Sequence, residues 1–383
     1  MTSATTEPAG KQSNPQPRKS KANGAGKSQP RLKSARASTY QLAAVKWLWP
    51  SRFAIGKLGI LAGLPDEGKG QILADMAART TRASEWPCGE GLAPLGNVIL
   101  LTADDGIEDT VVPRLFAADA DLNRVEIVTM VVASGNRDRM FNLGTDLELL
   151  REKIAEVGDV KLVLIDPISA YLGTGKIDSF RTTDVRAVLG PLVDLANELR
   201  VAVVGIMHFN KKTDVTNALL RISDSLAFGA AARHVYAVVD DPENKCKLFV
   251  RGKNNLVAAT KALAYSFGVR EVGRDPKTDQ TIHAPHIIWH PKHVDVTATE
   301  AMQAATEARS PTARDEAKTF LADILANGSV TKNEIEEAAK ANGIAERTLF
   351  RAKSTLKIIP KKDGSNGEWT WRLPGQPKRW DRV

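Results

Sequence analysis

The sequence contains few cysteines and no long apolar run, and each absence excludes a class of protein. Cys88 and Cys246 are the only cysteines among its 383 residues, and they lie far apart. Two distant thiols argue against a disulfide framework or a cysteine-based metal site, and they fit a reducing compartment. No apolar run approaches the ~20 residues of a membrane span, and no apolar segment follows the basic N-terminal residues as in a secretory signal. We therefore expect a cytoplasmic protein without a membrane partner.

The basic charge is concentrated at the two ends of the chain. The formal net charge is +8, and residues 1–38 hold eight basic residues against one acidic residue. Because this segment is mostly Ser, Pro, Gly, Ala and Lys, it cannot bury enough apolar surface to offset its ordering entropy. We expect residues 1–38 to be a disordered basic tail and residues 376–383 to be a second basic tail. Such ends either contact a polyanion or only keep the protein soluble, and the charge alone favours neither.

Apolar segments alternate with helical patterns from residue 39 to residue 297. Segments 58–63, 97–105, 160–173 and 201–210 are nearly continuous apolar runs, which are typical of strands buried on both faces. Amphipathic patterns of helical period separate them. This alternation predicts an α/β domain whose mostly parallel sheet is covered by helices on both faces.

A different pattern follows this domain. Residues 298–311 are rich in Ala, Thr and Glu, and they are interpreted as a linker. Residues 312–375 then show three short helical patterns and a hairpin, the order of a small winged helix-turn-helix domain. Thr331 and Glu334 have the spacing of a capping box at the second helix. The basic residues predicted to contact DNA lie on the third helix and the wing: Arg347, Arg351, Lys353, Lys361 and Lys362.

The segment LAGLPDEGKGQ has the glycine and lysine spacing of a phosphate-binding loop. Gly63 is followed, after four residues, by Gly68 and Lys69, between a predicted strand and a predicted helix. In such a loop the backbone amides and the helix N-terminus bind phosphates, and the lysine reaches the terminal ones. An ordinary strand-to-helix turn is the alternative. The predicted nucleotide-binding residues are Gly63, Asp66, Glu67, Gly68, Lys69, Gly70 and Gln71.

Gly70 stands where this pattern normally has Ser or Thr, so the loop lacks a hydroxyl that binds magnesium. Mg²⁺ prefers six oxygen ligands and commonly keeps several waters. Water, Asp66 or Glu67 is expected to supply the missing oxygen, although carboxylates at a loop apex more often point to solvent. The loss should weaken metal binding more than nucleotide binding. We expect ATP and Mg²⁺ as cofactors, and we expect Gly70→Ser to raise the rate of ATP hydrolysis.

Polar residues end three of the predicted strands. Asp166 follows four apolar residues and is predicted to hold Mg²⁺ through water, while Asp104 is predicted to orient the attacking water. The alternative for these carboxylates is an N-cap of the following helix, and for Asp105 the N-cap is favoured. His208 ends a strand at the edge of the sheet where parallel-sheet proteins bind ligands. A core histidine is the alternative for His208.

Four segments together resemble a known family. In chain order, they are GKLGILAGLPDEGKG, NVILLTADDG, VKLVLIDPISAYLG and VAVVGIMHFNK. Over roughly residues 45–270, they resemble the RecA-like P-loop ATPases of the RepA hexameric replicative helicase type. The resemblance implies that Lys69 binds phosphates and that Asp166 is the metal carboxylate. It also implies that Asp104 stands in place of a catalytic Glu and that His208 senses the γ-phosphate.

The resemblance extends to partners. It implies that Lys253 completes the active site of a neighbouring subunit, and that Lys211 and Lys212 face DNA in a central channel. A homo-oligomer such as a hexameric ring is therefore expected, with single-stranded DNA passing through the ring and duplex DNA bound by the winged helix.

The predicted function is an ATP-hydrolysing, DNA-associated motor or loader in DNA replication. Slow hydrolysis is expected because Asp104 is one methylene shorter than Glu and Gly70 lacks the hydroxyl, and a misplacement of about 1 Å can cost ~10²-fold in rate. The alternative is a nucleotide-switched DNA-binding regulator without significant hydrolysis. A small-molecule kinase is disfavoured because no acceptor site is recognisable and the winged helix would be unexplained.

Four of the six histidines are clustered near the end of the α/β domain. They are His283, His286, His290 and His293. Zinc binding is disfavoured, because Pro285 and Pro291 break any helix that would align them and no cysteine or carboxylate pair joins them. An apolar strand that carries histidines by chance is preferred.

Overall fold

The computed structural model describes residues 1, 32, 34–132, 138–173, 182–209, 226–257, 260–309, 313–362 and 367–375. The chain divides into a unit of residues 1–44 and a unit of residues 45–383. Most of the predicted N-terminal tail, all of the predicted C-terminal tail, and Lys211 and Lys212 lie outside the described residues. No helix in these ranges is long and apolar enough to cross a membrane.

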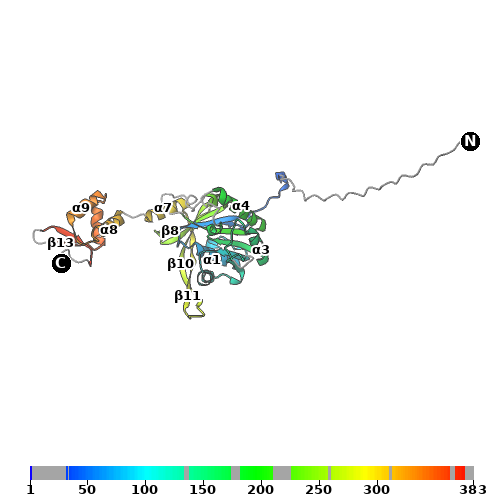
Figure 1. Ribbon diagram of the computed structural model, residues 1–383, viewed down its shortest axis with the longest axis horizontal. Helices are drawn as coiled ribbons and strands as arrows, with labels where there is room; N and C mark the ends of the chain where they lie inside the picture. Colours follow the sequence, from blue (N-terminus) through cyan, green and yellow to red (C-terminus); the bar gives the residue numbers. More distant parts are fainter. Residues whose placement is uncertain are drawn as a thin grey trace. The chain divides into compact units, whose positions relative to one another are not determined.

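Nine strands of the described residues form one sheet in the order β11-β10-β9-β8-β3-β7-β6-β4-β5 (Figure 1). The parallel part contains β3 (Leu58–Gly63), β4 (Asn97–Thr102), β5 (Val125–Val128), β6 (Val160–Asp166), β7 (Ala202–His208) and β8 (His234–Asp241). The antiparallel extension contains β9 (Cys246–Asn254), β10 (Ala262–Arg274) and β11 (Thr281–Val294). The predicted mostly parallel sheet is confirmed.

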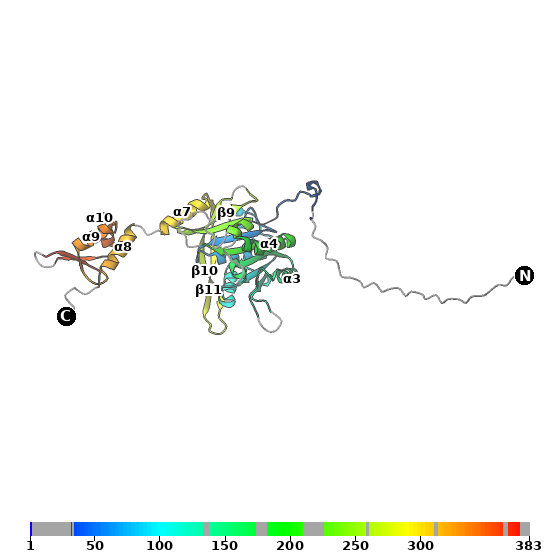
Figure 2. The same cartoon turned by 45° about the horizontal axis from the view of Figure 1, so that its top comes forward.

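Helices cover both faces of this sheet (Figure 2). One face packs on α1 (Lys69–Arg82) and α2 (Val112–Ala117). The other packs on α3 (Leu147–Val157), α4 (Thr182–Leu199), α6 (Leu226–Ala231) and α7 (Ala298–Arg309). Strand β6 shows why the apolar runs are continuous: Val163 and Ile165 enter one core, whereas Leu162 and Leu164 enter the other.

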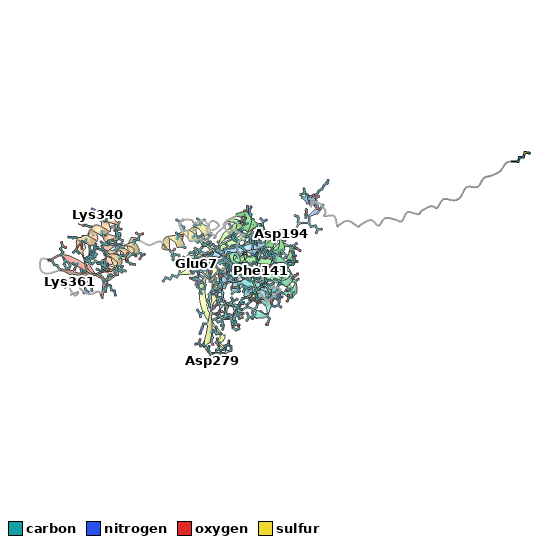
Figure 3. The ribbon with its side chains drawn as sticks, viewed as in Figure 1. Glu67, Phe141, Asp194, Asp279, Lys340 and Lys361 are labelled. Atoms are coloured by element: carbon teal, nitrogen blue, oxygen red, sulfur yellow. The ribbon has the colours of Figure 1, made fainter. Side chains whose placement is uncertain are left out.

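Aromatic side chains close one part of the second core. The short strands β1 (Trp47–Trp49) and β2 (Phe53–Ala54) pair with each other, and Trp49 stacks on Trp86 and on Phe249. The β10–β11 hairpin runs outward from the sheet, with Asp279 at its outer tip (Figure 3).

Helix α7 corrects the prediction of a linker at residues 298–311. Ala301, Met302 and Ala305 are buried in the same core as the parallel strands. Thr297 and Glu300 exchange the hydrogen bonds of a capping box, with Glu300 N donating to Thr297 Oγ1 at 3.2 Å. An alanine-rich composition suggested a linker, but here alanine supplies a small apolar helix face that packs closely on the strands.

The C-terminal elements have a core of their own. In order they are α8 (Ala313–Ile324), β12 (Val330–Thr331), α9 (Lys332–Ala341), α10 (Glu346–Thr355), β13 (Ile359–Lys362) and β14 (Trp369–Arg372). The three strands form an antiparallel sheet in the order β12-β14-β13, and the buried Trp371 packs against the helices. The capping box of Thr331 and Glu334 is confirmed.

Candidate active site

The loop between β3 and α1 has a backbone that only certain residues adopt. Asp66 and Gly68 are both left-handed, with φ of 61° and 82°. A Cβ on Gly68 would lie 2.5 Å from the ring of Phe267, so the position requires glycine for its conformation and for its space. Gly68 is the N-cap of the 14-residue helix α1, and no side chain of the described residues caps the first amides of the helix, an arrangement that suits an anion site.

Glu67 supports the loop from inside. Its side chain is buried, and its Oε2 accepts a hydrogen bond from Leu64 N at 3.2 Å. Tyr265 Oη donates to the backbone oxygen of Glu67 at 2.6 Å. The expectation that an apex carboxylate points to solvent fits the exposed Asp66 but is wrong for Glu67. Glu67 acts here as a structural brace of the loop.

Lys69 is buried and crosses its own loop. Its Nζ donates to the backbone oxygen of Leu64 at 2.7 Å. Burial lowers the pKa of Lys69, while the nearby carboxylates of Glu67, Asp166 and Asp66 oppose that shift. In the free protein the ammonium thus has one carbonyl partner that a phosphate oxygen can replace.

The carboxyl ends of the parallel strands bring the predicted residues to the same cleft. His208 is the register partner of Gly63, and Asp166 is the register partner of Thr102. The cleft has a volume of about 420 Å³. Its lining includes the predicted residues Asp66, Gly68, Lys69, Gly70, Gln71, Asp104, Asp166 and His208. It also includes Asp105, for which an N-cap was expected, and the unpredicted residues Pro65, Thr102, Arg114, Ile206, Phe267 and Pro285.

Asp166 is a partly buried carboxylate at the end of β6. Burial raises its pKa to about 6, with Asp105 and Asp104 adding to the rise and Lys69 and Arg114 opposing it. Several carboxylates meet at this edge of the sheet, and two cationic side chains only partly compensate them.

The N-cap interpretation of Asp105 is wrong. The turn after β4 is capped by Gly106, and no side chain forms the cap. Asp105 instead pairs with the guanidinium of Arg114 on α2. No sequence motif marks this pair, because nine residues and a change of element separate the two side chains.

Arg114 also approaches the loop at its unusual residue. A Cβ built on Gly70 would lie 3.3 Å from Arg114 Nη1 and 3.6 Å from Asp166 Oδ2. The guanidinium therefore borders the space that a Ser or Thr side chain would enter.

The side chains around Gly70 do not fit the magnesium site expected there. Gly70 offers no side-chain oxygen, and a guanidinium borders that space. Within the described ranges, no three His, Cys, Asp or Glu side chains are grouped so that they could hold a metal ion. Asp166, whose Oδ2 would lie 3.6 Å from a Cβ built on Gly70, is the carboxylate beside this space that could contact a magnesium ion bound to phosphates.

His208 lines the cleft. Within the described residues its buried ring nitrogen Nδ1 has no hydrogen-bond partner. Burial and the charge of Lys69 lower its pKa, while Asp104 opposes that shift, and the lower pKa favours the neutral ring. A neutral imidazole offers one N–H donor and one acceptor to a ligand.

Lys253 lies outside the cleft. Its Nζ donates to the backbone oxygens of Gly229 at 2.7 Å and Ala232 at 2.9 Å, at the end of α6. A lysine that binds these carbonyls stabilises the C-terminus of a helix. Among the clustered histidines, His290 pairs with Ser266, and His293 pairs with Glu90.

The predicted DNA-contacting residues have different surroundings. Arg351 on α10 and Lys361 and Lys362 on β13 are exposed. Lys353 instead lies over Trp371, with its Nζ 4.0 Å from the ring centroid, and burial lowers its pKa. For Arg347 only the backbone, within α10, is described.

Comparisons with known proteins place part of the chain beside one sequence family. The sequence model of a family described as "AAA domain" matches residues 26–214, which include the loop and the three strand ends of the cleft. No curated protein matches the chain. Among solved structures, the chain is similar to one whose title describes an ATPase domain, with 14% sequence identity and a TM-score of 0.43 over 57% of this chain and 87% of that chain. The family match and the geometry of the loop together support an ATPase domain with a phosphate-binding loop in this part of the chain.

Proposed function

We propose that the chain binds ATP in this cleft and hydrolyses it slowly, as a DNA-associated motor or loader of the RepA-like helicase type. The observation that carries the proposal is the convergence of Lys69, Asp104, Asp166 and His208 around one glycine loop. Each of these side chains lies at the carboxyl end of a parallel strand or shortly after it, where open α/β sheets bind their ligands.

Each side chain has a role that its surroundings support. Lys69 leaves the carbonyl of Leu64 and binds the terminal phosphates together with the loop amides. Asp104 is exposed at the mouth of the cleft and accepts a proton from the attacking water. The water oxygen bonds to the γ-phosphorus as the bond to the β–γ bridging oxygen breaks, leaving ADP and phosphate. The neutral His208 contacts the γ-phosphate and distinguishes ATP from ADP.

DNA contact and assembly belong to the same proposal. The C-terminal order helix, strand, helix, helix, strand, strand supports a winged helix, and Arg351, Lys361 and Lys362 give it an exposed basic surface. We assign duplex DNA to this domain and single-stranded DNA to the region of Lys211 and Lys212. In an oligomeric ring, Lys253 would exchange its α6 carbonyls for a neighbour's nucleotide.

A nucleotide-switched regulator is the second candidate. Asp104 is exposed and short, and Gly70 has no hydroxyl, so two features that promote hydrolysis in the related enzymes are weakened. Binding itself relies on Lys69 and on backbone amides, which are retained. This combination favours a protein that binds ATP well and turns it over poorly.

A steady-state ATPase assay with and without single-stranded DNA tests the proposal. We expect slow magnesium-dependent release of phosphate that DNA accelerates and that Lys69→Ala abolishes. Lys46→Ala removes an exposed lysine outside the cleft and is the matched control. ATP binding without phosphate release under either condition would replace the motor by the switch, and absence of ATP binding would refute both.

A further inference from the structure

Arg114 is a cation in the cleft to which neither the loop motif nor the strand-end residues assign a role. It projects from α2, and its guanidinium lies between the Asp105 carboxylate and the place where a side chain on Gly70 would begin. Its side chain is only 25% exposed, so it is held in this position and does not extend into solvent.

The charges of the cleft make a second cation necessary. The acidic residues that line it are Asp66, Asp104, Asp105 and Asp166. Against them, Lys69 and Arg114 are the cationic side chains of the lining. A triphosphate brings further negative charge to a site that these carboxylates already line. Lys69 alone would leave most of that repulsion uncompensated.

We propose that Arg114 is a second cationic ligand of the nucleotide phosphates, and that the absence of a side chain at position 70 gives its guanidinium direct access to them. This inference rests on the proposed ATP site. Arginine suits this role because its planar donors bind two phosphate oxygens at once and its charge is permanent. Asp105 holds the guanidinium ready in the free protein, and the phosphates compete for it when ATP enters.

The proposal has a consequence for magnesium. In a loop with a hydroxyl, the ion supplies part of the positive charge at the β- and γ-phosphates. Here a guanidinium borders the corresponding space. ATP binding should therefore depend less on magnesium than the loop motif suggests, although hydrolysis still uses ATP as its magnesium complex. If Arg114 instead serves only to neutralise Asp105, its removal leaves nucleotide affinity unchanged.

Equilibrium titration of the full chain with ATP, in magnesium and in EDTA, distinguishes these roles. We expect the native protein to lose less than about 10-fold in affinity in EDTA. Arg114→Gln should bind ATP roughly 10- to 100-fold more weakly than the native protein does, because one or two charge-assisted hydrogen bonds are lost. Asp105→Asn should bind ATP at least as tightly as the native protein, because it frees the guanidinium. Arg82→Gln, which removes an exposed arginine on α1, is the matched control.

Two further variants, Arg114→Lys and Gly70→Val, distinguish a lost phosphate contact from a folding defect. Arg114→Lys keeps the charge and should recover part of the affinity, whereas Gly70→Val keeps the arginine and displaces it from the loop. Thermal unfolding of each variant shows that it is folded. Affinity of Arg114→Gln and Gly70→Val within twofold of the native value in both buffers overturns the proposal. If the native protein does not bind ATP even in magnesium, the proposed ATP site is wrong, and so is this role of Arg114.

Discussion

The sequence predicts a functional role for both Lys69 and Lys353. Lys69 is buried and Lys353 is partly buried, and the two side chains have different neighbours. Burial lowers the pKa of both Lys69 and Lys353. Around Lys69 the neighbours are carboxylates and a single carbonyl partner, whereas Lys353 lies over the ring of Trp371, 4.0 Å from its centroid. The first ammonium stands at an open cleft where an anion can replace its partner. The second lies over an aromatic ring and is only partly exposed, so a basic residue on a predicted recognition helix is not by itself a DNA contact.

We expect Lys69→Ala to have the largest effect and to weaken ATP binding without changing DNA binding. We expect ATP affinity to fall ~100-fold or more, because a buried charge-assisted contact to phosphate is lost. Binding of duplex DNA should be unchanged. Lys353→Ala should keep native ATP affinity and should make the C-terminal domain less stable. The measurements are ATP titration, DNA titration and thermal unfolding of both variants. Equal ATP affinity of Lys69→Ala and native protein would remove the phosphate role from this loop.

Gly70→Ser tests whether position 70 and Arg114 affect ATP hydrolysis independently. From the sequence, the restored hydroxyl is expected to raise the rate of hydrolysis. In the structure, the new Cβ would lie 3.3 Å from Arg114 Nη1, so the guanidinium must move by a few tenths of an ångström to admit the side chain. We therefore expect little gain from Gly70→Ser alone and a gain of ~10-fold when it is added to Arg114→Ala, the effect of a restored metal contact.

A double-mutant cycle of magnesium-dependent ATPase rates measures this coupling. The four proteins are the native chain, the two single variants and the double variant. Additive effects would show that position 70 and Arg114 act independently.

The fold was more predictable than the cleft, for a physical reason. Buried parallel strands and the glycine loop leave patterns in consecutive residues, so the sequence could place Asp166 and His208 at strand ends that line one cleft. Arg114 reaches the loop from another element, and its pairing with Asp105 depends on tertiary packing.

The sequence analysis did not predict helix α7, although the pattern that marks this helix is local. Its signal was local, in the capping box of Thr297 and Glu300 and in a face of Ala and Met. An alanine-rich composition is also compatible with a linker, so composition alone was ambiguous.

Asp166→Asn tests the charge imbalance of the cleft through stability. The folded pKa of Asp166, about 6, lies above the ordinary value of 3.8, so ionisation is disfavoured in the folded state. The penalty is absent below about pH 4, grows between about pH 4 and 6, and reaches at most about 3 kcal/mol above that range. Without nucleotide, the variant should be more stable than the native protein at about pH 7.5 and equal to it at about pH 4. Urea unfolding at both pH values measures this, with the exposed Asp119→Asn as control. A variant that is less stable at the higher pH would show that the carboxylate is well compensated.

The smallest expected effect concerns the C-terminal domain and its salt dependence. Arg351 is exposed on α10, so Arg351→Gln should weaken duplex binding and reduce the slope of log affinity against log salt by about 1. Lys353→Gln carries the same change of charge two residues away, but its ammonium lies over Trp371. It should leave the slope unchanged and cost roughly 0.5–2 kcal/mol of domain stability through the lost cation–π contact. Titration of the full chain with a fluorescent duplex at several salt concentrations compares the two variants. A slope that falls equally for both would mean that Lys353 leaves its aromatic partner to bind phosphate, and the contrast with Lys69 would disappear.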